Sequence, residues 1–469
     1  MLLSPYQRVL FFLALSIGFR FWTFFPAVID HDESTYIIIA DQLLSGQWPY
    51  VHNIDVKPPA IYVLFAAILS ICDSILSIRL LTTIVIGFSG LLAYKSHKNL
   101  FGMETGAMLT GVLFVFCASL HKWSWSGNTE IFFVCCSLWS LYLMTRSKSI
   151  RDFLWAGIIL GIGFSFKYHI LFDIVPYLAI IVWVKMLPLN RLVKSLLVLG
   201  MSFLIPILTI TLCYYFYGHL DDLLQATVLI PSRYSNQHSF AKAIGLFGEF
   251  YLSFLPISLV FILGIYNIYS QSKQGNKWFF IWIIWILSTW TGILVTGKYY
   301  FHYLYQALIP FTFLIGAFVN QQPKLFQRIQ HISKRQILVA FSVALLCTWV
   351  NQFLQLYRKP DHIREIASFI EKDLPKDKLV YTNDKNILYY LCGTDPPTRY
   401  VHTSLLYKED LIKSYGIDTN RAFQDIRAKQ PLYYVIRDKV PSPFQTQISQ
   451  SYNQVKTFGE NTIVYRRRD

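Results

Sequence analysis

The most informative pattern along the chain is a series of long apolar runs separated by short polar segments. A run of about 20 apolar residues is long enough to cross a lipid bilayer as a helix. Eleven segments approach this length, at residues 8–25, 78–95, 106–121, 129–145, 153–167, 169–185, 193–216, 248–270, 278–296, 300–319 and 336–354. The pattern predicts an α-helical, polytopic membrane protein of eleven spans. Because both members of the pair at 153–185 are short, the count is least certain there.

Two shorter helical patterns lie in the long polar segment at residues 26–77. The first covers residues 34–45 between an acidic start and Gly46, and the second covers residues 60–71 after Pro58 and Pro59. These residues are typical of the two ends of helices. Twelve residues are too few for a comfortable span, so the pattern predicts interfacial helices in a first external loop.

In the last part of the chain, long apolar runs give way to alternating helical and strand patterns. Residues 361–373, 386–391 and 420–429 have helical patterns, whereas residues 378–382, 432–436 and 462–465 read as strands. Such alternation is typical of a small α/β domain. We therefore predict a transmembrane catalytic domain at residues 1–354 and a C-terminal external α/β domain at residues 355–469.

Composition supports the division into two parts. Hydrophobic residues make up 54% of the 469 residues and charged residues only 15%, against about 25% charged residues in an ordinary globular protein. Charged residues are about 10% of residues 1–354 but about 29% of the remainder, which is the contrast expected between a membrane domain and a soluble one. A fully soluble enzyme and a disordered protein are both excluded.

The charge distribution predicts the orientation in the membrane. The net charge is +15, but the basic residues are dispersed between the apolar runs, which argues for positive-inside loops and against nucleic-acid binding. With the N-terminus in the cytoplasm, fifteen Lys and Arg residues of the membrane part fall inside and six outside. The expected location is therefore the plasma or inner membrane, with the C-terminal domain periplasmic or extracellular. Most acidic residues of the membrane part fall outside, as a polar reaction chamber on the external face would require.

Two charged clusters lie in the first external loop. Asp30-His31-Asp32-Glu33 follows the first apolar run, and Asp55-Val56-Lys57 precedes the two prolines. The acids either begin a solvated helix or supply a general base beside the bilayer. Lys57 either extends its ammonium group to the membrane surface or forms a fixed cation for a phosphate; the rigid prolines after it favour the phosphate.

The ordered set HDESTY, GQWPY and DVKPP after one apolar segment resembles the dolichyl-phosphate-mannose protein mannosyltransferase superfamily. It looks most like the bacterial branch of aminoarabinose lipid A transferases and lipopolysaccharide-core sugar transferases. Further segments also resemble this family, at residues 125–130, 161–167, 297–303 with Pro310, and 388–400. The resemblance implies the GT-C fold, a polyprenyl-phosphate sugar as donor, and action on the external face.

The resemblance also implies roles for residues of the first loop. Asp32 matches the essential acid of the family, with Glu33 beside it and Tyr36 one turn on, and Lys57 matches the lysine that holds the donor phosphate. Asp55 is a partner for Lys57. The aminoarabinose enzymes tend to have Glu immediately before this lysine. This chain has Val56 there, which argues against a metal site at that position and against assuming aminoarabinose as the sugar. No cofactor is certain, and a divalent metal elsewhere stays open.

Further candidates for substrate binding lie near the external ends of the predicted spans. These are Glu130, Lys167, Arg233, Lys298 and His302. Four of them have an ordinary structural alternative: Glu130 as a charge at a helix start, Lys167 as a partner of Asp173 inside the bundle, Arg233 as a solvated side chain, and His302 as a hydrogen-bonded histidine at the start of a span.

Together these features predict a membrane glycosyltransferase, a hexosyl- or pentosyltransferase that inverts the anomeric carbon. Its expected partners are membrane lipids, the polyprenyl-phosphate sugar, and an acceptor that is lipid A or lipopolysaccharide, a cell-envelope glycan, or a protein. A transporter or flippase of lipid-linked sugars, and a polysaccharide ligase with a diphosphate donor, are the alternatives. A transporter would need paired charges at mid-membrane, whereas the charges here gather near one face.

Overall fold

The computed structural model describes residues 4–146, 148–233, 239–272, 277–322, 333–358, 361–437 and 442–468. The chain divides into two compact units. We call the first the helical unit; it comprises Met1–Phe24, Arg79–Leu212 and Asn236–Gln355. We call the second the loop–sheet unit; it comprises Phe25–Ile78, Cys213–Ser235 and Leu356–Asp469.

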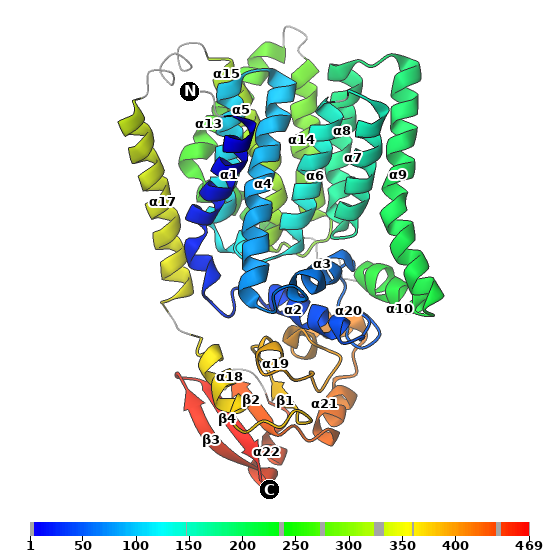
Figure 1. Cartoon of the computed structure of the whole chain (residues 1–469), viewed down its shortest axis with the longest axis vertical. Coiled ribbons are helices and arrows are strands. Elements are labelled where there is room, and N and C mark those ends of the chain that lie inside the picture. Colours follow the sequence, from blue (N-terminus) through cyan, green and yellow to red (C-terminus); the bar gives the residue numbers. More distant parts are fainter. Residues whose placement is uncertain are drawn as a thin grey trace. The chain divides into compact units, whose positions relative to one another are not determined.

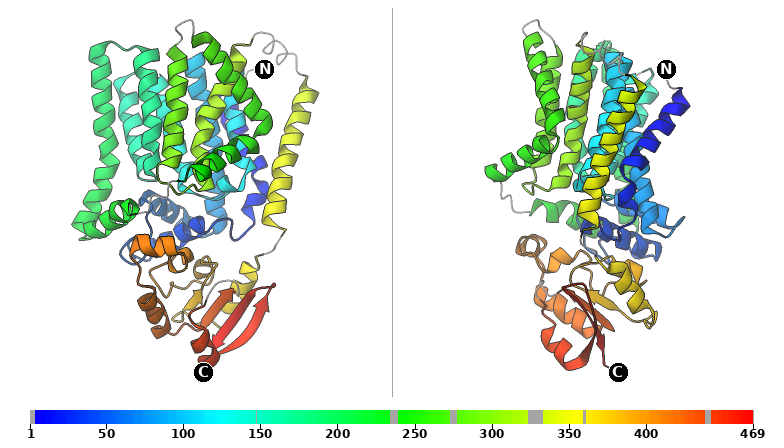
Figure 2. Two further views of the ribbon diagram at one scale, coloured as in Figure 1. Left: turned by 180° about the vertical axis from the view of Figure 1, so that it is seen from behind. Right: turned by 90° about the vertical axis from the view of Figure 1, so that its left-hand side faces the viewer.

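The helical unit is a bundle whose long helices run side by side (Figures 1 and 2). Its helices are α1 (Pro5–Phe19), most of α4 (Ile75–Phe101), α5 (Glu104–Leu120), α6 (Thr129–Arg146), α7 (Ile150–Phe164), α8 (Leu171–Ile180), most of α9 (Leu189–Phe216), α12 (Phe240–Ser253), α13 (Leu255–Ser272), α14 (Lys277–Leu294), α15 (Leu308–Asn320) and α17 (Lys334–Leu356). Every predicted apolar segment overlaps one of these helices, so the helical character of the predicted segments is confirmed.

The number of spans stays a prediction. Within the described ranges, six helical segments are long and apolar enough to cross a membrane, and the pair α12–α13, bent by 104°, would give a seventh. Helices α1 and α5 are apolar but shorter. Pro176 lies inside α8 and Pro206 inside α9, as is tolerated where neighbouring helices or side chains satisfy the freed carbonyls.

Small residues bring two helices of the bundle close together. A Cβ atom on Gly316 of α15 would lie 2.6 Å from the carbonyl oxygen of Gly106 on α5, closer than real contacts allow. The side chain of Asn320 accepts a hydrogen bond of 2.9 Å from the backbone N–H of Gly106. Glycine therefore permits a helix contact that a larger side chain would block.

A buried arginine ties together non-helical backbone in the same unit. Arg20, at the end of α1, is fully buried, and its guanidinium donates hydrogen bonds of 2.8 and 2.6 Å to the carbonyls of Ser124 and Trp125. A buried guanidinium needs acceptors for its five donors. These bonds fix the segment that leads into α6, where Glu130 lies.

The loop–sheet unit combines the first loop with the C-terminal residues. Its helices are α2 (His31–Leu44), α3 (Ala60–Leu69), α10 (Leu220–Leu224), α11 (Ile230–Ser232), α18 (Ile363–Glu371), α19 (Leu388–Leu391), α20 (Glu409–Tyr415), α21 (Thr419–Ala428) and α22 (Gln445–Ser451). Its strands are β1 (Val380–Thr382), β2 (Tyr433–Arg437), β3 (Tyr452–Phe458) and β4 (Thr462–Arg467).

The described strands form a single sheet of order β1-β2-β4-β3. Strands β1 and β2 are parallel, and the other two pairings are antiparallel. A bulge shifts the register of β3 between Gln454 and Lys456. Buried aromatic side chains, among them Tyr381, Tyr434 and Phe444, form the core of the unit with aliphatic residues of α20, α21 and α22.

The predicted elements of the C-terminal part are confirmed, with β3, α20 and α22 added by the structure. The two short helices of the first loop are also confirmed, as α2 and α3, while their location at a membrane interface stays a prediction. The first loop packs in the same unit as the C-terminal residues: the N–H of Ile54 donates to the carbonyl of Arg399 at 2.9 Å, and Asn386 donates to Thr35 at 2.9 Å. The predicted domain boundary at residue 354, which concerns the membrane, stays a prediction.

Candidate functional site

The first turn of α2 positions the predicted catalytic acid. Asp30 is the N-cap residue, and its carboxylate accepts a hydrogen bond of 2.9 Å from the backbone N–H of Asp32. Such a cap satisfies a helix donor that would otherwise have no partner. The cap also fixes the position of the Asp32 backbone in the first turn of the helix. Glu33, the next residue, is buried with 1% of its surface exposed.

Asp32 lies between two cationic partners in the loop–sheet unit. Its Oδ2 atom lies 3.5 Å from Nζ of Lys57, and its Oδ1 atom lies 3.2 Å from Nε2 of His402. The hydroxyl of Tyr36, one turn later on α2, donates to Oδ2 at 3.4 Å. About a fifth of each of the Asp32, Lys57 and His402 side chains is exposed, so the group is shielded but reachable by a substrate.

The backbone around Lys57 is held in place by tyrosines. Tyr50, with a positive φ of 70°, donates from its hydroxyl to the carbonyl of Lys57. Asp55 accepts hydrogen bonds of 2.8 Å from Tyr62 of α3 and 2.7 Å from the N–H of Val56. Burial raises the pKa of Asp55 above its ordinary value, although the nearby Lys57 opposes the shift. Asp55 therefore supports the loop, and its oxygens are bonded to this loop and α3 rather than directed to solvent.

A second set of charges continues from the first. Nε2 of His31 lies 3.9 Å from Asp384, and its ring centre lies 6.2 Å from that of His402. Asp384 in turn lies 2.9 Å from Arg437 and 3.9 Å from Lys385. Ionisable side chains thus follow one another from Lys57 through Asp32 and the two histidines to Asp384.

Sequence reasoning missed the C-terminal members of this group. His402 and Asp384 are about 370 and 350 positions from Asp32 in the chain, and no periodicity connects them. The only available signal was the family-like segment that ends at Tyr400, two residues before His402. The structure therefore adds His402 as the contact through which the C-terminal residues reach the predicted base.

The two histidines of this group should respond to pH in opposite ways. Burial alone would lower the pKa of His402, but the hydrogen bond and charge of Asp32, with Asp55 and Asp30 nearby, raise it above 6.5. Burial, with Lys385 and His402, lowers the pKa of His31 to about 4. A raised histidine pKa gives stability that is present below 6.5 and lost as pH rises through the folded-state value. A lowered one gives stability that is present above 6.5 and lost as pH falls towards 4.

We expect the thermal unfolding midpoint of the purified protein to be highest near pH 6.5, because these two effects meet there. The His402→Gln variant should lose the decline on the alkaline side, and the His31→Gln variant should lose the decline on the acid side. The measurement is the unfolding midpoint in detergent between pH 4 and 9. Identical pH profiles in wild type and both variants would contradict the arrangement of charges described here.

A separate charged cluster lies in the helical unit. Glu130 begins α6 and forms an ion pair with Lys167, which precedes the turn before α8. Nε2 of His302 lies 3.8 Å from the same carboxylate oxygen, and Nζ of Lys167 lies 3.7 Å from the ring centre of Tyr303. Glu130 and Lys167 are 2% and 6% exposed. Mutual pairing offsets the desolvation of two buried charges.

The alternative pairing predicted for Lys167 is wrong. Asp173 accepts hydrogen bonds of 2.7 Å from Ser137 and 2.8 Å from Gln306, while Lys167 contacts Glu130. Asp173 is in the first turn of α8 and faces α6 and the turn before α15, where neutral donors satisfy it without a cation. The structure brings together Glu130, Lys167 and His302 as predicted members of one site.

The last two predicted residues are Lys298 and Arg233. Lys298 follows α14 in the helical unit, and its backbone N–H donates to Thr296 at 3.4 Å. Arg233 follows α11 in the loop–sheet unit with an exposed side chain. Their part in substrate binding stays a prediction.

The side chains present do not form an evident metal site. In the described part of the chain, no group of three or more His, Cys, Asp or Glu side chains is placed to hold a metal ion. Val56 also supplies no ligand beside Lys57. No chemical step below is therefore assigned to a metal.

Comparisons with known proteins bear on both units. Residues 56–215 match the family model described as dolichyl-phosphate-mannose-protein mannosyltransferase. The whole structure is similar to the crystal structure of ArnT from Cupriavidus metallidurans bound to undecaprenyl phosphate, with a TM-score of 0.66 and 13% identity over 98% of each chain. The chain has the GT-C fold. The family match supports the resemblance recognised in the first loop, since its range includes Lys57 and the two prolines that follow.

Other solved structures are similar at lower TM-scores. The Archaeoglobus fulgidus oligosaccharyltransferase complex with Zn and sulfate has a TM-score of 0.54 and 13% identity, over 97% of this chain and 72% of that chain. Its apo form has a TM-score of 0.51. No curated protein sequence matches this chain. The family match includes Lys57, Glu130 and Lys167 but begins after Asp32, so the role of Asp32 depends on the geometry above.

Proposed function

We propose that this GT-C protein moves a sugar from a polyprenyl-phosphate donor to an acceptor on the external face of the membrane. The observation that carries the proposal is the placement of Asp32 between Lys57 and His402. A carboxylate and a cation on adjacent parts of one loop are what this transfer needs: one group to remove a proton and one to hold a phosphate. The acceptor would be lipid A or lipopolysaccharide, a cell-envelope glycan, or a protein.

In the proposed reaction, the oxygen of an acceptor hydroxyl attacks the anomeric carbon of the donor sugar. The bond between that carbon and the phosphate oxygen breaks, and its electron pair leaves with the polyprenyl phosphate. Asp32 takes the hydroxyl proton as general base. A single displacement of this kind inverts the anomeric configuration. The phosphate is already a good leaving group, so no general acid is required.

Lys57 would stabilise the charge that develops on the leaving phosphate. Its ammonium group lies 3.5 Å from Asp32, a distance at which a bound phosphate can compete for the same cation. A cation placed in a shielded site before the reaction acts more strongly than one in water. Release of Lys57 towards the phosphate would also leave Asp32 more basic, because a neighbouring positive charge lowers the proton affinity of a carboxylate.

His402 would act as a positioning residue rather than as the base. Its contact of 3.2 Å fixes one oxygen of Asp32, which leaves Oδ2 to face Lys57 and an incoming hydroxyl. Glu33 and Asp55 are buried neighbours that support this loop. Tyr36 donates to the same carboxylate and completes the proposed set in the loop–sheet unit.

The cluster of Lys167, Glu130 and His302 supports a second part of the proposal. Lys167 and His302 face one carboxylate in the helical unit, and a buried cation beside an aromatic ring suits an anionic or sugar-bearing group. We assign these residues, with Arg233 and Lys298, to binding of the lipid-linked donor or of the acceptor.

The activity can be tested in proteoliposomes that contain the purified protein. A labelled sugar on undecaprenyl monophosphate is supplied together with a glycolipid extract, and new glycosidic products are measured. Transfer of label to the extract is the expected result. Movement of labelled lipid across the bilayer without product would identify a flippase. Transfer that occurs only from a lipid diphosphate would identify a ligase.

A further inference from the structure

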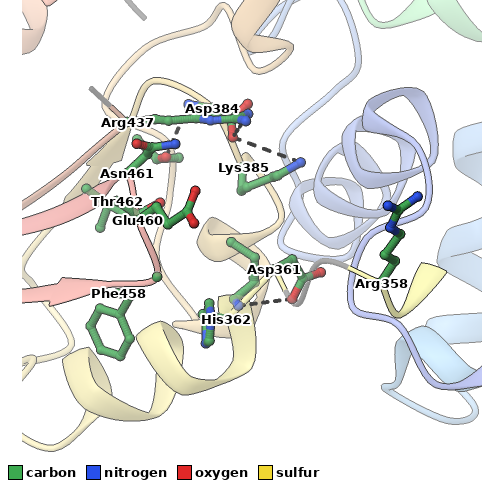
Figure 3. A pocket seen from close by; sticks show the side chains of 14 residues that line it. Arg358, Asp361, His362, Asp384, Lys385, Arg437, Phe458, Glu460, Asn461 and Thr462 are labelled. Carbon is green, nitrogen blue, oxygen red and sulfur yellow. Dashed lines mark hydrogen bonds and ion pairs between the residues drawn. The ribbon is translucent and has the colours of Figure 1, made fainter. Parts of the chain in front are cut away.

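A pocket lies at one end of the strands in the sheet of the loop–sheet unit (Figure 3). Its volume is about 530 Å³, within the range of sites that hold small ligands. The parallel strands β1 and β2 end at Thr382 and Arg437, and β4 begins at Thr462; all three residues line the pocket. Ligands of α/β sheets commonly bind at the carboxyl ends of parallel strands.

The charges of the pocket wall are balanced. Three basic side chains (Arg358, Lys385, Arg437) are matched by three acidic ones (Asp361, Asp384, Glu460), with His362 beside them. A site for a polyphosphate would show a clear excess of cations. A balanced set of carboxylates, cations and an amide instead suits a ligand with many hydroxyl groups and no large net charge, because such groups both donate and accept hydrogen bonds.

Hydrogen bonds and ion pairs hold part of the wall in place. Asp384 contacts Arg437 and Lys385, and the backbone N–H of Arg437 donates to Asn383 at 2.9 Å. Asp361 accepts a hydrogen bond of 3.1 Å from the N–H of Ile363 (Figure 3). A wall that is already ordered loses little conformational freedom when a ligand binds.

The turn between β3 and β4 supplies another part of the wall. Gly459 has a φ of +57°, and a Cβ atom there would lie 3.1 Å from the ring of His362, so glycine allows the turn to approach that ring. Glu460 and Asn461 follow it and line the pocket. Their carboxylate and amide can form hydrogen bonds with hydroxyl groups of a ligand.

We infer that this pocket is a carbohydrate subsite that holds a neutral sugar unit of the acceptor. Asp384 connects it with the catalytic group, because the carboxylate that lines the pocket also faces His31, next to His402 and Asp32. The assignment of this sugar to the acceptor rests on the proposed function. The inference that the pocket binds a carbohydrate rests on the pocket residues and not on the proposed function. A glycan held here would extend from the C-terminal sheet towards the reacting hydroxyl.

Binding can be measured without any transfer reaction. The full-length protein is placed in lipid nanodiscs, which lack the sugar headgroups of maltoside detergents. Saturation-transfer NMR then reports contact with methyl β-D-glucoside, methyl α-D-mannoside or N-acetylglucosamine, and competition with inorganic phosphate tests the anion alternative. We expect saturation of the ring protons of at least one sugar, and no displacement by phosphate.

The decisive comparison uses the double variant Glu460→Ala, Asn461→Ala and the matched control Glu371→Ala. Glu371 is an exposed acid at the end of α18 that does not line the pocket. The double variant should lose the sugar signal and raise the KM for acceptor about tenfold, as expected for two lost hydrogen bonds, with unchanged kcat and donor KM. The control should match wild type, and equal unfolding midpoints would show that both variants are folded.

Three results would overturn the inference: no sugar signal in wild type, an equal signal in the double variant, or displacement of the sugar by phosphate. Absence of the proposed transferase activity would not overturn it, because sugar binding is measured directly and not through transfer. Sugar binding that depends on Glu460 and Asn461 in a protein without transfer would preserve the subsite and refute the proposed function.

Discussion

The Asp32→Asn variant is expected to lower kcat for sugar transfer by about 10² to 10⁴, the usual contribution of a positioned general base. Asparagine has nearly the same size and can still bond to His402, but it cannot take the proton of the acceptor hydroxyl. The donor KM should change little, because Lys57 remains. The measurement is transfer of labelled sugar from undecaprenyl monophosphate in proteoliposomes at saturating donor and acceptor.

The matched control for this variant is Glu371→Gln, which makes the same chemical change at an exposed position. Its rate should equal that of wild type. Retention of more than about a tenth of the wild-type kcat by Asp32→Asn would assign the base to another group, since a general base contributes more than this. A flippase would in addition keep lipid translocation in the variant.

The Lys57→Ala variant is expected to lower kcat/KM by about 10² to 10³, as does removal of one charge-stabilising donor from a preorganised site. The loss should appear both in donor KM and in kcat, because Lys57 is proposed to contact the phosphate before and during bond breakage. Lys57→Arg should recover part of the activity, since it keeps the positive charge but changes the geometry. Initial rates over a range of donor concentrations test these expectations.

Lys429→Ala removes an exposed lysine that follows α21 in the same unit, and it serves as the control. Its kinetics should be unchanged. If Lys57→Ala alters only acceptor KM, Lys57 is not the phosphate ligand. The unfolding midpoint must also be compared, because loss of Lys57 leaves the nearby carboxylates Asp32 and Asp55 without this cation.

The long apolar runs made the helical unit predictable from sequence, because burial in lipid or protein demands continuous apolar helices. The first loop was also predictable, since Asp32 and Lys57 lie in one short segment with a recognisable motif. Strand β3 was not, because five of its seven residues are exposed and polar positions dominate it. Its pairing with β4 uses backbone hydrogen bonds, which do not depend on an alternation of apolar and polar side chains.

Contacts between residues far apart in the sequence are the part of the candidate site that could not be predicted. Contacts such as those of Asn386 with Thr35 and of Ile54 with Arg399 hold the first loop against the C-terminal residues and so bring His402 to Asp32. None of these pairs has a sequence signature. Lys167 likewise pairs with Glu130 because neutral donors already satisfy the Asp173 carboxylate. Tertiary packing set the partners of these side chains, which the residue types alone do not reveal.

The bulge in β3 has a consequence for how copies of this protein can associate. An unpaired edge strand offers its N–H and C=O groups to strands of other chains, and bulges and lysines are common means of preventing this. Strand β3 is an edge of the sheet, is irregular between Gln454 and Lys456, and carries the Lys456 ammonium over the rings of Phe369 and Phe458. This edge therefore resists extension into an intermolecular sheet, and Lys456→Val would turn it into a site of aggregation.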